Sequence, residues 1–302
     1  MPLESQLHVD TLLSNVSIKY RNPNFVAMEI FPEVSVKKSS DLYRVYDRDF
    51  RIPETNRSHK GLAREHSFNV SNASYVLERH ALKDYVSDNA ADNYDLADLR
   101  AETTEELTDK ILMRLEKSVS QLMTKTSFSL NLSLTSTLAW NATTTVDPVS
   151  LFDTGTVSVV LNSGNKPNLA GMNLPSWHAF KNNAQILDRI KYTSQEVGMG
   201  IAAALIGAEK LVVSQMAEDT AFEGQSTGAN IVQMWNDNVY WGYRPAAPGP
   251  LKASAGYIFR KNIPMVKRYR VEERESDAIE VNMEYSAKIV ASLSAFLICD
   301  VI

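Results

Sequence analysis

The chain has 302 residues, a formal net charge of −5, and 44% hydrophobic and 22% charged residues. This composition is ordinary for a globular protein that buries a core, and the negative balance argues against a dedicated nucleic-acid binder. The single cysteine, Cys299, excludes an intrachain disulfide, and its place in an apolar run predicts a buried side chain. The N-terminus lacks a signal-peptide pattern and Ile289–Ile302 is too short to cross a bilayer, so we expect no membrane contact.

The first 34 residues are predicted to form an extended arm, because prolines interrupt any regular element there. After the arm, Val36–Val45 and Phe68–Val76 alternate like two strands, and the charged run Tyr46–Gly61 separates them. This pattern predicts a long hairpin with a hydrophilic tip. The stretch Tyr20–Asp88 has too few apolar residues for a core of its own, and isolated two-stranded hairpins are marginal in water. We therefore expect the hairpin to lie on a partner subunit.

Charges of opposite sign are separated along the chain. Lys37–Glu65 holds eight basic against five acidic residues, whereas Asp84–Asp109 holds nine acidic residues against the single Arg100. We expect the basic hairpin to dock on the acidic segment of a neighbouring subunit; two solvated faces are the alternative. A further basic cluster runs from Arg260 to Arg274 and could face nucleic acid or the acidic segment of an adjacent subunit; the second interpretation is favoured. The candidates for contacts between subunits are Arg44, Arg48, Arg51, Arg57, Lys60, Arg64, Asp92, Asp95, Asp98, Glu105, Arg268 and Arg270.

The clearest helix follows the acidic segment. Thr103–Glu106 matches a capping box, and apolar residues recur every three or four positions from Leu107 to about Lys125. This predicts an amphipathic helix about 30 Å long, with polar residues, Glu116 among them, on the faces away from the core. The acids at 92, 95 and 98 fall near its start, where carboxylates usually cap a helix.

The middle of the chain mixes short helices and strands, which predicts an α/β region with helices around a small sheet. An edge strand is expected within 127–145, where Leu alternates with small polar residues. The remaining expected elements are helices at Pro148–Leu161, from Pro175, and at Ile201–Ile206, and strands at Asn168–Met172, Lys210–Ser214 and Ile231–Trp241.

The last fifty residues are expected to return to long strands. Val266–Glu273 alternates, and Ile279–Val301 reads as one strand with its apolar residues on a single face. A strand of that length is unusual, since five or six residues are typical.

No set of residues predicts chemistry. Gly198–Ala203 has the G-x-G-x-x-A form of a dinucleotide loop, but a strand is expected after the glycines and not before them. The five histidines show no paired metal-ligand spacing, and one cysteine cannot supply a zinc cluster. No serine or cysteine nucleophile has its usual signature. We therefore expect no catalytic residues, no cofactor and no metal.

Five segments resemble the N-terminal arm and extended loop of major capsid proteins of tailed bacteriophages. These segments are Tyr20–Ala27, Ile30–Val34, Tyr43–Asp47, Arg51–Pro53 and Ala81–Asp84. The resemblance implies an α+β fold of the Hong Kong 97-like kind. It also implies the following division: 1–34 N-terminal arm, 35–82 extended β-hairpin loop, 83–145 peripheral domain with a long spine helix, 146–260 axial domain, and 261–302 C-terminal strands of the peripheral domain.

The function implied by this resemblance is structural and not enzymatic. Copies of the chain would assemble into hexamers and pentamers that form an icosahedral head around non-specifically held double-stranded DNA, with portal, scaffold and decoration proteins as further partners. The subunit would assemble in the host cytoplasm and end in the virion. Some capsid proteins of this fold join a loop lysine to an asparagine of another subunit; Lys60 is placed for that by sequence order, although a solvated lysine is the favoured interpretation. Two alternatives are an encapsulin-type compartment shell and, from a different class, a nucleotide-dependent oxidoreductase.

Overall fold

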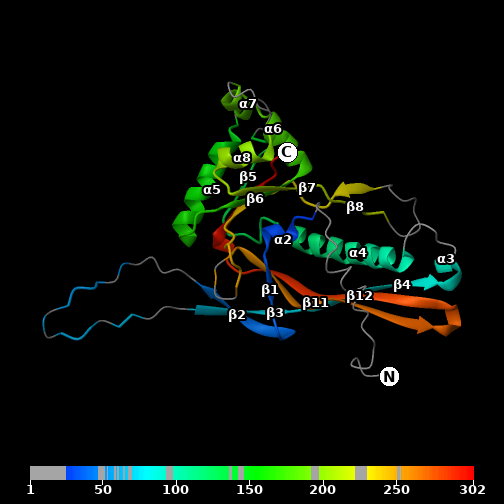
Figure 1. The fold of residues 1–302 in the computed structure, drawn as a ribbon. Helices are drawn as coiled ribbons and strands as arrows, with labels where there is room; N and C mark the ends of the chain where they lie inside the picture. Colours follow the sequence, from blue (N-terminus) through cyan, green and yellow to red (C-terminus); the bar gives the residue numbers. More distant parts are fainter. Residues whose placement is uncertain are drawn as a thin grey trace.

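The structure is a computed structural model that describes residues 25–46, 52, 54–57, 59, 61–63, 65–66, 70–92, 98–135, 138–141, 146–191, 197–221, 230–249, 252 and 254–302. Its strands form a four-stranded sheet, a five-stranded sheet and two separate two-stranded ribbons (Figure 1). The elements in chain order are α2 (Ala27–Ile30), β1 (Glu33–Ser35), β2 (Ser40–Tyr46), β3 (Val70–Val76), β4 (Glu78–Ser87), α3 (Asp88–Asp92), α4 (Leu99–Leu122), β5 (Asn131–Ser133), α5 (Pro148–Ser163), β6 (Leu169–Asn173), α6 (Leu174–Asn182), α7 (Ala184–Ile190), α8 (Met199–Ile206), β7 (Lys210–Ser214), β8 (Ala217–Asp219), β9 (Ile231–Gln233), β10 (Val239–Gly242), β11 (Gly256–Val271), β12 (Ser276–Ile289) and β13 (Ala295–Cys299).

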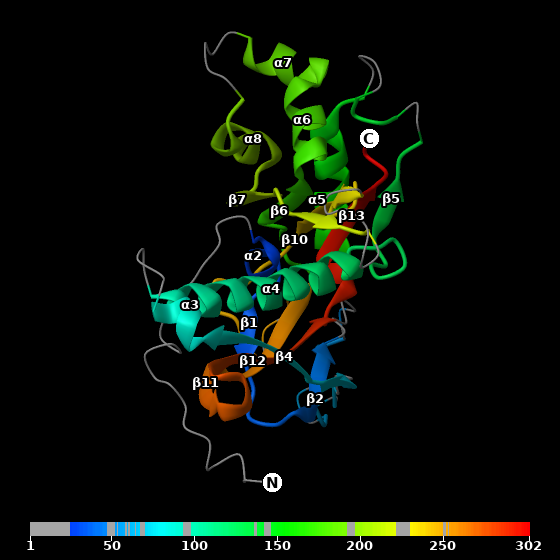
Figure 2. The ribbon, with the colours of Figure 1, turned by 90° about the vertical axis from the view of Figure 1, so that its right-hand side faces the viewer.

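The four-stranded sheet has the order β1-β11-β12-β4 and carries α4 across one face (Figure 2). β11 and β12 form a long antiparallel hairpin, in which Gly256 pairs with Ile289 and Val271 with Ser276. The buried stripe of α4, which includes Leu115 and Val119, shares a core with Val281 on β12. The long amphipathic helix predicted from the sequence is therefore confirmed, and one stripe of it packs on the sheet.

The start of α4 differs from the prediction. The helix begins at Leu99, and Asp98 caps it by accepting a hydrogen bond from the backbone N–H of Arg100 at 3.1 Å. The capping box expected from Thr103 to Glu106 is wrong, because these residues lie inside the helix. The Thr103 hydroxyl donates back to the Leu99 carbonyl at 2.8 Å, a bond that a threonine within a helix can make.

The five-stranded sheet has the order β5-β13-β10-β6-β7, and its central strands β13, β10 and β6 are buried on both faces. Its residues alternate between two cores: Leu297 faces the core shared with α4, while Phe296 and Ile298 face a second core beneath α5, α6 and α8. The helices and strands predicted between 148 and 214 are confirmed, and β5 is a short edge strand as expected. Gly207 ends α8 in the left-handed conformation that glycine adopts at little cost (φ 68°).

Two predicted strands are each divided between different sheets. The strand expected at Ile231–Trp241 is β9 and β10, separated by a polar stretch around Asp237. The single strand expected at Ile279–Val301 is β12 and β13, separated by a 3₁₀ turn at Ser292–Ser294. Alternation with period two continues through the second interruption, so there the pattern alone did not show that the chain crosses to another sheet. The division into arm, loop, peripheral and axial regions stays a prediction.

Candidate interaction surfaces

The predicted hairpin is present as the β2–β3 ribbon. Its strands pair antiparallel from Ser40 opposite Val76 to Tyr46 opposite Val70. The base of the ribbon packs on its own chain, because the Tyr75 ring stacks on Phe259 of β11 with the ring centroids 4.6 Å apart. The expectation that the hairpin relies wholly on a partner is therefore corrected: its base is held by the four-stranded sheet of the same subunit.

The outer part of the ribbon projects away from both sheets (Figure 1). There Ile52 is 96% and Leu62 95% exposed, and in the paired strands behind them Leu42 is 64% and Val76 60% exposed. Single exposed apolar residues are common on protein surfaces, but several on one projecting ribbon mark an interaction site. We define Leu42, Ile52, Leu62 and Val76 as the ribbon surface.

Only part of the predicted basic set on the hairpin can be placed. Arg57 is exposed near the tip, and its guanidinium Nε donates to the Gly61 carbonyl at 2.5 Å. The backbone of Arg44 lies in β2, and its side chain falls outside the described residues. Also outside the described residues are Arg48, Arg51, Lys60 and Arg64.

The predicted acidic set lies at the opposite end of the molecule from the hairpin tip (Figure 1). Asp92 ends α3, Asp98 caps α4, and Glu105 is exposed about two turns further along α4. Asp95 lies outside the described residues. The structure thus brings the three described acids to one end, which we call the acidic end.

The C-terminal basic cluster has partners within the same chain. Arg270 contacts both carboxylate oxygens of Asp88, at 2.5 and 2.6 Å. Arg268 and Arg100 both donate to Asp277, at 2.8 and 3.1 Å. Burial alone would raise the pKa of Asp277, but the hydrogen bonds from the two arginines lower it below its ordinary value. This network was not predicted, although the β11–β12 register that places Arg270 opposite Asp277 follows from the turn at Glu272–Arg274.

Glu116 was predicted to lie on a polar face of α4, and this is wrong because its side chain is fully buried. Its carboxylate accepts hydrogen bonds from the backbone N–H groups of Val26 (3.1 Å) and Ala27 (2.8 Å) and from the indole Nε1–H of Trp235 (2.5 Å). Burial raises the pKa of Glu116, and the three hydrogen bonds offset part of that effect. Periodicity gives no signal for such a residue, because the N–H groups that donate to its carboxylate come from distant segments of the chain.

Comparison with known proteins shows which proteins this chain is similar to. No family model matches the chain. The major capsid protein of Burkholderia phage BcepMu is 23% identical over 97% of this chain and 96% of that protein. The major capsid protein of Pseudomonas phage JBD67 is 25% identical over 78% of this chain and 77% of that protein.

Solved structures with a similar fold are also related to phages. A phage-related protein from Bordetella bronchiseptica RB50 superposes with a TM-score of 0.81 at 19% identity, over 98% of both chains. The capsid of Cyanophage P-SCSP1u superposes with a TM-score of 0.63 at 9% identity, over 99% of this chain and 92% of that one. The chain is a relative of phage major capsid proteins and has their Hong Kong 97-like fold.

Within this capsid fold, the glycine motif does not have the layout of a dinucleotide loop. Met199 to Ile206 form the short helix α8, and the strand β7 follows the helix instead of preceding the glycines. A Cβ atom added at Gly198 or Gly200 would meet no heavy atom within 4 Å, so neither glycine is needed for a close approach.

Among the described residues, no group of three or more His, Cys, Asp or Glu side chains is placed to hold a metal ion. In the same part of the chain, no helix combines the length and the apolar character that crossing a bilayer requires.

Proposed function

We propose that this chain is the major capsid protein of a tailed bacteriophage and has a structural, non-catalytic role. Its copies assemble into hexamers and pentamers that close an icosahedral head around double-stranded DNA. The carrying observation is the ribbon surface, whose Ile52 and Leu62 side chains are at least 95% exposed on a part of the molecule that projects from the body. The similarity to phage major capsid proteins over almost the whole chain supports the same proposal.

The proposed contact is head-to-tail. The ribbon surface and the acidic end lie at opposite ends of the subunit, so one copy can present its hairpin to the acidic end of the next (Figure 1). A contact between two different surfaces generates a ring when the rotation between neighbours closes, which suits hexamers and pentamers. In this contact, Ile52 and Leu62 bury apolar area while the basic residues of the hairpin select the acidic neighbour.

The surroundings of the subunit follow from this role. We infer that it assembles in the host cytoplasm and resides in the virion, with portal, scaffold and decoration proteins as neighbours. Packaged DNA is held without a site-specific grip, since Arg260, Arg268 and Arg270 of the C-terminal cluster already have acidic partners within the chain.

A pair of substitutions tests the proposal. Ile52→Ser together with Leu62→Ser is expected to give folded subunits that form few rings or shells, because the ribbon surface loses its apolar contact area. Negative-stain microscopy and light scattering measure the assembly, and circular dichroism measures the fold. The matched control is Ile52→Val with Leu62→Met, which keeps the surface apolar and is expected to assemble normally. Wild-type-like shells from the serine variant would contradict the proposed contact.

A further inference from the structure

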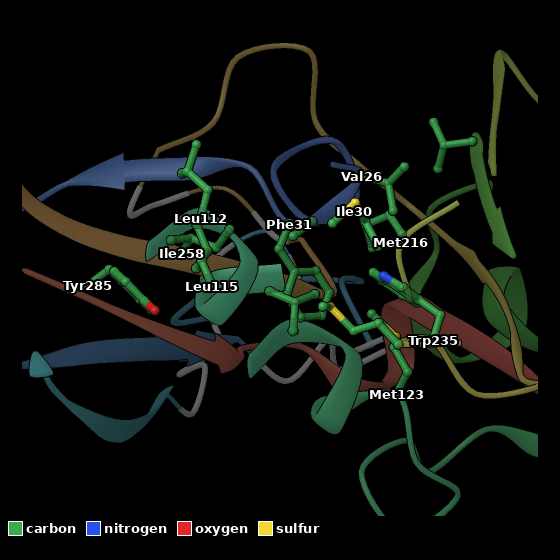
Figure 3. Packing of buried hydrophobic residues seen from close by; sticks show 14 of the residues in the cluster. Val26, Ile30, Phe31, Leu112, Leu115, Met123, Met216, Trp235, Ile258 and Tyr285 are labelled. Carbon is green, nitrogen blue, oxygen red and sulfur yellow. The ribbon is translucent and has the colours of Figure 1, made fainter. Parts of the chain in front are cut away.

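The helix α2 lies where the two sheets meet, and it contacts both of them. Ile30 packs so closely on β6 of the five-stranded sheet that a Cβ atom added at Gly171 would lie 2.6 Å from it. Phe31, at the end of α2, is equally close to Gly256 on β11 of the four-stranded sheet. Figure 3 shows Ile30 and Phe31 in this core, beside residues of α4 and the segment of Trp235. The position of α2 therefore affects how the two sheets pack against each other.

The Glu116 carboxylate is the polar group that holds this helix. Its oxygens accept hydrogen bonds from the backbone N–H groups of Val26 and Ala27 at the start of α2 and from the indole N–H of Trp235 beside them. It thus joins three segments, with Val26 90 residues before Glu116 and Trp235 119 residues after it in sequence.

Within the part of the chain that the structure describes, no ion pair involves Glu116. Two charged side chains on neighbouring elements are paired elsewhere: Glu29 of α2 with Lys210 of β7 at 2.6 Å, and Lys117 of α4 with Glu218 of β8. Its shifted pKa has burial and the three hydrogen bonds as its causes, and no neighbouring charge. Three N–H donors offset only part of the cost of burying a charge.

We infer that Glu116 is a proton-sensitive anchor, so that one proton on its carboxyl changes how firmly α2 is docked at the junction of the two sheets. Undocking of α2 would bring water to the carboxyl, so the undocked state titrates near the ordinary value of 4.5. The docked state binds the proton more tightly, and a state that binds a proton more tightly is favoured as pH falls. Docking of α2 is thus firmest at acidic pH and loosens as pH rises through the window above 4.5. This inference does not depend on the proposed capsid role.

Hydrogen exchange of the α2 amides tests the anchor in the intact protein, assembled or not. The readout is the protection of the backbone N–H groups of residues 26–31, corrected for the intrinsic exchange rate, between pH 5 and pH 8. In the wild type, protection is expected to fall with rising pH, by up to tenfold for each unit of pKa difference between the docked and undocked states. In Glu116→Gln, which cannot titrate, protection is expected to be independent of pH. The matched control is Glu106→Gln, an exposed acid on the same helix, which should keep the wild-type profile.

Two outcomes would overturn the inference. One is wild-type protection that does not vary with pH, and the other is the same pH profile in the wild type and in Glu116→Gln. If Glu116→Gln does not fold, Trp235→Phe replaces it as the deciding variant. That variant removes one donor and keeps the carboxyl, so the midpoint of the profile should move to higher pH. An unmoved midpoint would refute the anchor.

Discussion

The outer hairpin and the junction around α2 differ in how their large apolar side chains are satisfied. At the junction, the Ile30 and Phe31 side chains are no more than 1% exposed and lie against both sheets. On the hairpin, Ile52 and Leu62 are at least 95% exposed, and only the base of the ribbon is held by the body. The junction is complete within one subunit, whereas the hairpin offers contacts that another copy can fill. Substitutions at the junction should therefore change subunit stability, and substitutions on the hairpin should change association.

The largest expected effect on stability is that of Phe31→Ala. Phe31 is fully buried and meets Tyr240 edge-to-face with the ring centroids 6.3 Å apart. Because its removal leaves a cavity between the sheets, the free energy of unfolding should fall by about 3–5 kcal/mol. Urea unfolding of dilute, unassembled protein measures this change, since association would add its own contribution.

The control for this substitution is Leu187→Ala on α7, where the side chain is 48% exposed. Its effect on the free energy of unfolding should stay within about 0.5 kcal/mol. Equal effects of the two substitutions would mean that the junction is not the rigid centre that its packing indicates.

A smaller effect on stability is expected for Asp277→Asn at the far end of the four-stranded sheet. The change leaves Arg268 and Arg100 without the negative charge of their shared acceptor. The free energy of unfolding should therefore fall by about 1–3 kcal/mol. Because the pKa of Asp277 is lowered in the folded state, its contribution is present above the ordinary value of 3.8 and is lost as pH falls through the folded pKa.

Acid unfolding tests this sign. The difference in stability between the wild type and Asp277→Asn should be full at neutral pH and should shrink as pH drops below 3.8. Asp153→Asn on the exposed face of α5 is the matched control and should follow the wild type. A difference that grows on acidification would contradict the ion-pair assignment.

The two regions were also predicted with different success from the sequence. The hairpin, α4 and most elements between 148 and 214 follow from local periodicity and from proline and glycine positions, and these are present. The junction was missed because its parts are distant in sequence: α2 is only four residues long, and Glu116 reads as a polar-face residue until Val26 and Trp235 are brought beside it. The passage from β12 to β13 was missed for a related reason, since the same alternation serves two sheets.

The smallest effect on stability and a clear effect on association are expected for Arg57→Glu at the hairpin tip. Arg57 is exposed, so the subunit's free energy of unfolding should change by no more than about 0.5 kcal/mol. If the hairpin meets the acidic end, this reversal of charge should slow assembly, as light scattering would follow. Raising the salt concentration should reduce the difference from the wild type, because the screening length falls from about 10 Å at 0.1 M to about 3 Å at 1 M.

Combining Arg57→Glu with Glu105→Arg places the reversed charges at both proposed surfaces. Each single reversal should weaken assembly, and the double variant should recover part of the loss, because opposite charges again face each other. Lys166→Glu, an exposed lysine after α5, makes the same change of charge away from both surfaces and should assemble like the wild type. If the double variant assembles no better than the worse single variant, the hairpin does not meet the acidic end. The ribbon surface would then make an apolar contact with a different part of its neighbour.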